Sequence, residues 1–311
     1  MFNKGCKANN MRVKVIINSR SGRGRGREQS DIISTLGRRY GDLDIFPTKG
    51  PRHATELAAA AAGEGYDLVA AAGGDGTVHE VINGLMRGNE ASLPLGIIPI
   101  GSGNDLAFGL GFHEEAEEAI ERIFHGMLRP LDLARVTDER GKTEVFANNF
   151  GIGFDAIVVM RTETITRLHG FAMYFAAVLQ TILFYYNAPY LESVFDGESI
   201  NQRSLFLYLG LGPRGGGGFL LTPDAKWDDG LIDSVLVNPI GRLTMLKMLS
   251  SAMKGTHVTS RHVTMRQNRE ITVKSSSPMP IQLDGEMFAY PRDNVRQVTI
   301  TSLPAAIQVM V

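Results

Sequence analysis

Residues 68–77 read LVAAAGGDGT, and this stretch decides the fold. Its run of small and β-branched apolar residues predicts a buried strand, most typical of a parallel sheet. Three glycines within four residues then end the strand, and a helical pattern begins at Thr77. Such a turn presents unobstructed backbone N–H groups beside a helix N-terminus, which suits a phosphate. A plain turn in which Asp75 caps the helix has the same local pattern, so the stretch alone leaves both readings open.

Strands and helices alternate on both sides of this turn through the first 130 residues. Apolar runs predict strands at 11–17, 43–46 and 94–100, and helical patterns lie at 28–39, 51–64, 77–88 and 114–127. This alternation predicts a doubly wound α/β domain with a parallel sheet, which binds ligands beyond the carboxyl ends of its strands. Four of those ends carry Asn18, Thr48, Asp75, and Asn104 with Asp105. Their convergence favours a ligand site more strongly than any single motif does.

The loop after the first strand, residues 18–27, is rich in serine, glycine and arginine. It has no GxxxxGK[ST] pattern, so it is not a Walker A loop. Small polar residues with arginines suit phosphate oxygens, and a solvated loop has the same composition.

After Pro130 the pattern changes to short strands separated by Gly, Asn, Asp and Ser turns. Predicted strands lie at 131–136, 144–148, 204–211, 231–237, 258–265 and 270–273, and helices at 170–186 and 241–254. Many short strands predict an antiparallel sheet or sandwich. Neither an internal repeat nor a low-complexity linker is present, so a boundary near 130–140 rests on this change of pattern alone.

Composition limits the class of protein. The 311 residues are enough for two domains, and a formal net charge of −1 gives no reason to expect a nucleic-acid partner. Cys6 is the single cysteine, so no disulfide or zinc site can be built and a reducing compartment is expected. Residues 1–10 lack the apolar centre of a signal peptide, which favours a cytoplasmic protein.

Two segments bear on membranes. Residues 170–186, GFAMYFAAVLQTILFYY, are strongly apolar but shorter than the roughly 20 residues that span a bilayer. They predict a buried helix, or a helix that lines a lipid-accepting cleft. Residues 242–274 carry seven basic residues and one acidic residue, a balance of +6. We hypothesise that this segment meets anionic lipid headgroups, and a solvated basic face is the alternative.

Four motifs occur in a characteristic order: GGDGT at 73–77, GSGNDLA at 101–107, GGGFLLTPDAKWDDGLID at 216–233 and LDGE at 283–286. Together they resemble the diacylglycerol kinase catalytic family, and the chain's size resembles that of its soluble bacterial lipid kinases. The resemblance runs from about Val13 to the C-terminus. It implies an N-terminal α/β domain similar to those of 6-phosphofructokinase and NAD kinase, a C-terminal β-sandwich, and a nucleotide in the cleft between them.

The resemblance also divides the chain. Residues 11–138 are expected to form the nucleotide-binding α/β domain, and 139–299 the β-rich lipid-substrate domain. In related folds the final strand returns to the first domain, which makes residues 300–311 candidates for the same return.

The family's ATP-binding positions can be carried over residue by residue. They fall on Asn18, Ser21, Gly22, Thr48, Gly73, Gly74, Asp75, Gly76, Thr77, Val78, His79, Ser102 and Asn104. Ser102 stands where the family usually has threonine, so a hydroxyl is kept. Ser19 replaces the usual proline of the first loop, which leaves that loop's geometry less well defined.

Asp284 of the LDGE motif matches the family's proposed catalytic base, and Glu286 matches its partner. A carboxylate within hydrogen-bond reach can orient a lipid hydroxyl and accept its proton as the γ-phosphoryl group arrives. An Asp-Gly hairpin turn is the structural alternative.

The resemblance places magnesium at two positions. Asp75, Asp105 and Asp132 match an acidic network near a catalytic Mg²⁺, and carboxylates around a phosphate site need a cation. A second, structural Mg²⁺ would bind the Asp229 carboxylate and the backbone carbonyls of Lys226 and Leu231. A simple β-turn is the alternative at residues 228–230.

We therefore expect an ATP- and Mg²⁺-dependent lipid kinase that phosphorylates a hydroxyl of a diacylglycerol-like or other long-chain acceptor. Its partner would be a lipid substrate at the membrane surface, with peripheral membrane association; a homodimer is left open. One alternative is a kinase with a soluble acceptor, as in NAD kinase, which shares GGDGT. Another is a nucleotide- or lipid-binding regulator without turnover, against which the retained Asp75, Asp105, Asp284 and Glu286 argue.

Overall fold

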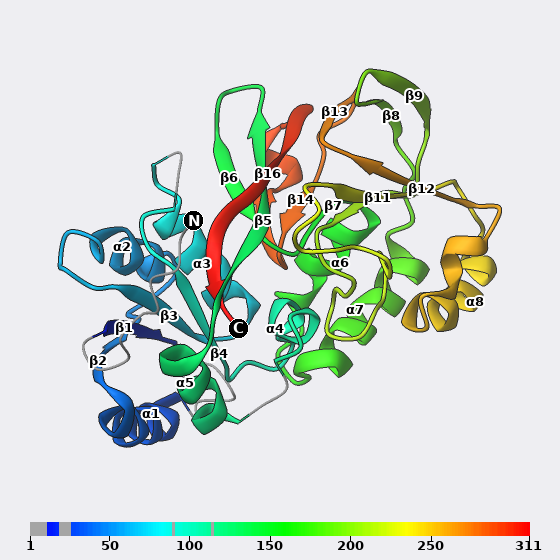
Figure 1. Ribbon diagram of the computed structural model, residues 1–311. Coiled ribbons are helices and arrows are strands. Elements are labelled where there is room, and N and C mark those ends of the chain that lie inside the picture. The colour runs from blue at the N-terminus through cyan, green and yellow to red at the C-terminus, as the bar shows by residue number, and fades with distance from the viewer. Residues whose placement is uncertain (1–10, 19–25, 89–90, 113–114) are drawn as a thin grey trace. The chain divides into compact units, whose positions relative to one another are not determined.

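The computed structural model describes residues 11–18, 26–88, 91–112 and 115–311, with the backbone alone described at 26–28 (Figure 1). The predicted nucleotide-loop residues Ser21 and Gly22 lie outside the described residues. The chain forms two compact units. The first unit comprises the residues up to Leu131 together with Ala306–Val311, and the second unit comprises Asp132–Ala305.

The first unit has a parallel sheet covered by helices on both faces. Its strand order is β2 (Asp42–Pro47), β1 (Arg12–Ile17), β3 (Leu68–Gly73), β4 (Leu95–Pro99) and then the end of β16 (Gln297–Met310). Val309 of β16 pairs in parallel with Leu95. The helices are α1 (Gly26–Tyr40), α2 (His53–Ala60), α3 (Asp75–Leu85), α4 (Asp105–Gly109) and α5 (Ala116–His125). The predicted doubly wound α/β fold is confirmed.

The sequence of β3 explains its central place. All six residues from Leu68 to Gly73 are buried, because α1 and α5 pack on one face of the sheet while α2 and α3 pack together on the other. Small alanines let helices approach both faces closely. Every side chain of such a strand must be apolar and compact, which is what LVAAAG supplies.

The second unit is built on two sheets. One is antiparallel, in the order β12 (Val263–Asn268), β11 (Ile232–Val237), β10 (Phe206–Gly210), β7 (Asn149–Gly153), β14 (Ile281–Leu283) and β15 (Glu286–Ala289). The other contains β13 (Glu270–Ser275), β8 (Tyr190–Phe195), β9 (Glu198–Arg203), β5 (Leu128–Asp138), β6 (Thr143–Phe146) and the first part of β16. One core cluster joins them, with Phe150 and Leu207 from the first sheet and Phe195 and Ile271 from the second. The predicted β-sandwich is confirmed.

Three helices pack on the outer face of the six-stranded sheet: α6 (Phe154–Thr162), α7 (Gly170–Phe184) and α8 (Arg242–Met253). The side chains of β10 alternate between the two faces of this sheet. Leu207 and Leu209 belong to the sandwich core, whereas Tyr208 packs against the helices. Two 3-10 turns, Thr256–Thr259 and Pro291–Asp293, complete the secondary structure of this unit. Within the described residues, no helix combines the length and apolar character needed to cross a bilayer.

Several elements differ from the sequence-based expectations. Helix α6 and the β8–β9 hairpin were not anticipated, and residues 256–259 form a 3-10 turn where a strand was expected to begin. The expected final strand is β16, which begins at Gln297, ahead of the expected 300–311. Helix α6 follows β7 directly, with Gly153 as its N-cap, so no separate loop marks its start in the sequence. The boundary between the units falls at Leu131 and Asp132, within β5.

Candidate active site

Two glycine loops of the first unit pack backbone against backbone. The first follows β3 at Gly73–Gly76, and the second follows β4 at Gly101–Asn104. A Cβ on Gly101 would overlap the Cα of Gly74, and a Cβ on Gly103 would lie 2.7 Å from Oδ2 of Asp75. Both loops therefore need glycine for close approach and not merely for turning.

Asp75 connects the same two loops through its side chain. It is the first residue of α3, and its Oδ1 accepts hydrogen bonds from the N–H groups of Asp105 (2.6 Å) and Leu106 (3.4 Å). The carboxylate thus caps the N-terminus of α4, thirty residues further along the chain. The sequence suggested a capping role for Asp75, but could not say which helix it would cap.

Asn104 offers an acceptor at this site. Its backbone is left-handed (φ 53°, ψ 45°), and its Nδ2 donates to the carbonyl oxygens of Gly101 (3.1 Å) and Pro99 (3.3 Å). Its Oδ1 is buried and has no hydrogen-bond partner among the described residues. A buried acceptor without a partner is costly, so a hydroxyl or amine of a bound ligand would satisfy it.

The remaining predicted nucleotide residues of the described chain also belong to the first unit. The N–H of Asn18 donates to Ala72 O (3.0 Å) and that of Thr48 to Ile17 O (2.8 Å), which places both at strand ends. Ser102 is exposed, whereas Thr77, Val78 and His79 are buried. The N–H groups of Thr77 and Val78 already donate to Gly74 O, so phosphate contacts from this segment must come from amides that precede them.

Glu80 is a residue that the motif analysis missed. Its two carboxylate oxygens accept from the N–H groups of Arg52 (2.9 Å) and Ala54 (3.1 Å), so α3 holds the start of α2 just beyond Thr48. Glu80 directly follows GGDGTVH in the sequence. This position, in the first turns of the helix after the glycine loop, is the sequence feature that could have identified it.

Asp284 lies in the second unit, in the two-residue turn between β14 and β15. Asp284 and Gly285 have φ values of 50° and 87°, the positive pair that a type I′ hairpin requires. The Asp284 carboxylate is buried and accepts three backbone N–H bonds, from Ala147 (3.0 Å), Asn148 (2.9 Å) and Asn149 (2.9 Å). The hairpin turn and the fixed carboxylate, which the sequence analysis weighed as alternatives, are both present. Glu286, in contrast, is exposed.

A second turn repeats this construction. Asp196 and Gly197, between β8 and β9, have φ values of 46° and 91°, and the Asp196 carboxylate accepts from the N–H groups of Arg269 (3.0 Å) and Glu270 (2.8 Å). Asp196 is exposed, however, while only 8% of Asp284 is exposed. An Asp-Gly turn whose carboxylate accepts backbone N–H groups therefore does not by itself indicate a catalytic role. The feature that distinguishes Asp284 is the set of residues around it.

Those surroundings form a buried polar network. The Gly285 N–H donates to Oε1 of Gln282 (2.8 Å), whose Nε2 donates to Oδ2 of Asp155 (2.6 Å) and to Oδ1 of Asn149 (2.8 Å). The hydroxyl of Tyr174 donates to the other oxygen of Asp155 (2.8 Å). The network thus runs from the Asp284 turn to α6 and α7. Gln282, Asp155 and Tyr174 were not singled out from the sequence, because their distances along the chain give no signal.

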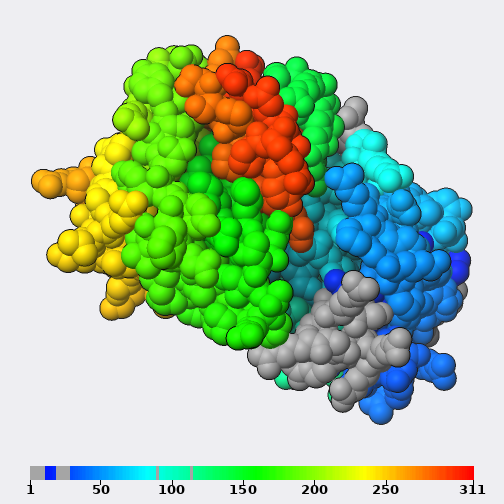
Figure 2. Space-filling view, turned by 180° about the vertical axis from the view of Figure 1, so that it is seen from behind, coloured from blue at the N-terminus to red at the C-terminus, as the bar shows by residue number. Residues whose placement is uncertain are grey.

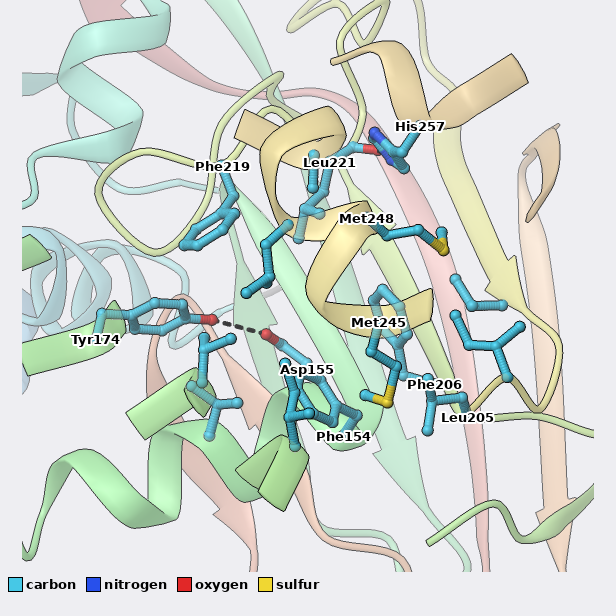
Figure 3. A pocket seen from close by; sticks show the side chains of 17 residues that line it. Phe154, Asp155, Tyr174, Leu205, Phe206, Phe219, Leu221, Met245, Met248 and His257 are labelled. Atoms are coloured by element: carbon cyan, nitrogen blue, oxygen red, sulfur yellow. Dashed lines mark hydrogen bonds between the residues drawn. The ribbon is translucent and has the colours of Figure 1, made fainter. Parts of the chain in front are cut away.

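The network ends in an apolar cavity of about 90 Å³ (Figure 3). The cavity lies between α6, α7, α8 and the outer face of the six-stranded sheet, with walls that include Phe154, Val178, Phe219, Met245 and Leu249. Asp155 contributes to its lining, with Tyr174 beside it. Burial raises the pKa of Asp155, and the hydrogen bonds from Tyr174 and Gln282 act in the opposite direction.

His257 is a further polar residue of the cavity wall. Its Nε2 lies 3.1 Å from Leu221 O, and burial lowers the pKa of His257. The imidazole is therefore neutral at neutral pH, with Nε2 as the donor.

The predicted metal-binding residues fall in both units. Asp75 and Asp105 belong to the first unit, and Asp132 to the second, where its two oxygens accept from the N–H groups of Gly230 (2.6 Å) and Ala305 (2.6 Å). Across the described parts of the chain, no three His, Cys, Asp or Glu side chains are grouped as metal ligands.

The predicted structural-metal turn carries unfavourable charge. Oδ1 of Asp229 accepts from the Leu231 N–H (3.0 Å). Burial and the carboxylates of Asp229 and Asp224 raise the pKa of Asp233 to about 6. The donors expected here, one carboxylate and two backbone carbonyls, are all oxygens, which is the donor type that Mg²⁺ prefers.

Comparisons with known proteins agree with this geometry. The family description "Diacylglycerol kinase catalytic domain" matches residues 12–136, and "YegS C-terminal NAD kinase beta sandwich-like domain" matches residues 148–311. The chain is 30% identical to the "Diacylglycerol kinase" of Mycobacterium tuberculosis, over 96% of this chain and 94% of that protein. The chain belongs to the diacylglycerol kinase family. It is accordingly a lipid kinase, an enzyme that phosphorylates an alcohol.

Two further proteins with lipid-kinase names are similar to this chain. A Chromohalobacter salexigens protein named "Probable lipid kinase YegS-like" is 34% identical, over 74% of this chain and 73% of that protein. The crystal structure of a diacylglycerol kinase from Bacillus anthracis superimposes with a TM-score of 0.77 at 24% identity, covering 96% of each chain. That likeness supports the two-domain fold.

The contact between the glycine loops gives a first prediction. Gly101→Ala forces the Gly74 and Gly101 backbones apart, so we expect a loss of about 1–3 kcal/mol in unfolding free energy and weaker ATP binding. Gly50→Ala is the matched control, because a Cβ there meets nothing within 4 Å. Urea unfolding and ATP titration of both variants make the measurement. Equal behaviour of the two variants would show that the loops do not pack as described.

Proposed function

We propose that this chain is an ATP- and Mg²⁺-dependent kinase that transfers the γ-phosphoryl group to a hydroxyl of a diacylglycerol-like or other long-chain acceptor, with Asp284 receiving the hydroxyl proton. One observation carries the proposal: a fixed, buried carboxylate is connected by hydrogen bonds to the lining of an apolar cavity. A kinase that acts on an amphipathic alcohol needs both a group that orients the hydroxyl and an apolar site for the chain.

The nucleotide would bind at the glycine loops of the first unit. Amides at the start of α3 suit phosphate oxygens, because they lie at a helix N-terminus. The buried Oδ1 of Asn104 supplies an acceptor for a nucleotide hydroxyl or amine. Thr48 and Ser102 remain predicted nucleotide contacts.

Asp284 would orient the acceptor hydroxyl rather than act as a strong base. Phosphoryl transfer passes through a loose transition state, so positioning matters more than early proton removal. Three amide bonds fix the carboxylate in one orientation. The acceptor's position relative to this carboxylate then follows from where its chain is held. Glu286 is retained as the predicted partner of Asp284.

The cavity would hold part of the acceptor's chain. Its walls are apolar apart from Asp155, Tyr174 and His257. A cavity of about 150 Å³ admits benzene, so about 90 Å³ takes only a short stretch of one chain unless α7 and α8 separate. A soluble, NAD-like acceptor finds little polar complement in such walls, which favours the lipid over the soluble acceptor.

Bound Mg²⁺ would neutralise phosphate charge during transfer. The proposed ligands of the structural ion are the Asp229 carboxylate and the carbonyls of Lys226 and Leu231, while Asp75, Asp105 and Asp132 remain the predicted acidic network of the catalytic ion. Asp75 and Asp132 also hold loops in place through backbone amides, so their replacement would affect structure as well as metal binding.

The 226–231 turn gives a second prediction. Because the pKa of Asp233 is raised to about 6, folded protein binds a proton there more tightly than unfolded protein, and stability falls as pH rises from about 4 to 6. We expect Mg²⁺ to reduce this fall and to raise the melting temperature at pH 7. Asp229→Asn should remove the Mg²⁺ effect, and the exposed Asp228→Asn should retain it. A thermal shift that Asp229→Asn leaves intact would locate the ion elsewhere.

The third prediction tests the reaction. Purified protein with ATP and Mg²⁺ should phosphorylate one class in a panel of diacylglycerol, monoacylglycerol, phosphatidylglycerol and sphingoid bases. Asp284→Asn should lower kcat/KM by about 100-fold or more, since it removes the proton acceptor. Asp196→Asn is the matched control, because it alters the same kind of turn and amide contacts away from the network.

The outcomes separate the candidate functions. Equal losses of kcat/KM in the Asp284 and Asp196 variants would show that Asp284 has only a structural role in its turn. Phosphorylation of a soluble alcohol alone would favour the soluble-acceptor kinase, and ATP binding without turnover on any acceptor would favour a regulator.

A further inference from the structure

The surface ends of α7 and α8 carry exposed apolar side chains. Phe184 is 72% exposed and Leu243 is 78% exposed, and Leu183 and Tyr185 are 51% and 43% exposed. Single exposed apolar residues are common, but four of them at two adjoining helix ends form a patch that usually has a partner. We name these four residues the α7–α8 tip.

Arg242 holds the tip together. It is the first residue of α8, its Nε donates to the carbonyl oxygen of Ile182 in α7 (3.0 Å), and its guanidinium lies 5.3 Å from the ring centre of Tyr186. The end of one helix is thereby fixed to the start of the next. In the space-filling view, yellow and orange atoms of the segment around α8 project from the second unit beside its green atoms (Figure 2).

The two segments that form the tip carry basic residues and no acidic residue. The sequence has no Asp or Glu between Glu163 and Glu192, or between Asp233 and Glu270. Arg242, Lys247 and Lys254 are exposed on α8 and at its end. Not every basic residue of the segment 242–274 is available to a lipid headgroup. Arg266 forms a two-fold ion pair with Glu198 (2.7 and 2.9 Å), so its charge is already paired.

The inner faces of the same helices line the cavity. Val178 and Ile182 of α7 and Met245 and Leu249 of α8 contribute to its wall. The apolar surface of the tip and the apolar cavity are thus built on opposite sides of two short helices.

We propose that the α7–α8 tip inserts into the interface of an anionic lipid bilayer, with Arg242, Lys247 and Lys254 meeting the headgroups. Exposed apolar side chains on segments that carry cations and no acidic residue match the chemistry of such a surface. A second copy of the chain fits less well, because a two-fold contact would bring like charges together. A role of the α7–α8 tip in delivering the acceptor rests on the proposed function, whereas binding of the tip to a bilayer does not.

Co-sedimentation with vesicles of equal parts phosphatidylglycerol and phosphatidylcholine tests the proposal. We expect wild-type protein to bind these vesicles and to bind pure phosphatidylcholine more weakly. Phe184→Ser with Leu243→Ser should lower the affinity by about tenfold or more, and Lys247→Gln with Lys254→Gln should remove most of the preference for phosphatidylglycerol. The matched control, Tyr190→Ser with Val194→Ser, removes two exposed apolar side chains of β8 and should bind as wild type does.

A short-chain acceptor at a concentration below its micelle point completes the test. The tip variant should phosphorylate it at the wild-type rate, since neither altered residue lines the cavity. Unchanged vesicle affinity in the tip variant would overturn the proposal, and a change from dimer to monomer in its sedimentation velocity would assign the patch to a second copy. If wild-type protein binds vesicles through the tip yet phosphorylates no lipid alcohol, the proposed function fails while the surface stands.

Discussion

The buried carboxylate of Asp284 is the constraint on which the second unit's site depends. Three consecutive backbone amides, at residues 147–149, point at it, and the left-handed Asp-Gly turn keeps it there. A buried acceptor that is held by several amides is rigid, whereas a buried acceptor without partners would be costly. The strand β7, which begins at Asn149, is therefore tied to β14 by side-chain bonds as well as by the sheet.

The same logic explains the polar groups in an otherwise apolar wall. A carboxyl group beside a cavity of Phe, Leu, Val and Met side chains must be hydrogen-bonded, and Tyr174 and Gln282 each serve one oxygen of Asp155. Gln282 uses its amide oxygen for Gly285 at the same time. A displacement of α7 would therefore move the hydrogen-bonded side chains that lead to the Asp284 turn. In this way the space available to an acceptor is linked to the position of the Asp284 carboxylate.

The sequence predicted the parts of this structure that depend on local pattern. Periodicity identified the α/β alternation, and the glycine motif located the loops because backbone contact between Gly74 and Gly101 leaves no room for another residue. It could not find Gln282, Asp155 or Tyr174, whose contacts span 19 to 127 residues of chain. The three residues Asp-Gly-Glu alone could not separate Asp284 from Asp196, because both turns have them; the ordered motifs of the family resemblance singled out Asp284.

The central claim is that the Asp284 turn and the cavity form one acceptor site through the Gln282 network. A double-mutant cycle of Tyr174→Phe and Gln282→Leu, measured as kcat/KM for the preferred lipid alcohol, tests it most directly. The account predicts that the effects are strongly non-additive, by about 0.5–3 kcal/mol, and larger than the coupling in unfolding free energy. Additive effects on kcat/KM, or a coupling that stability alone reproduces, would contradict it.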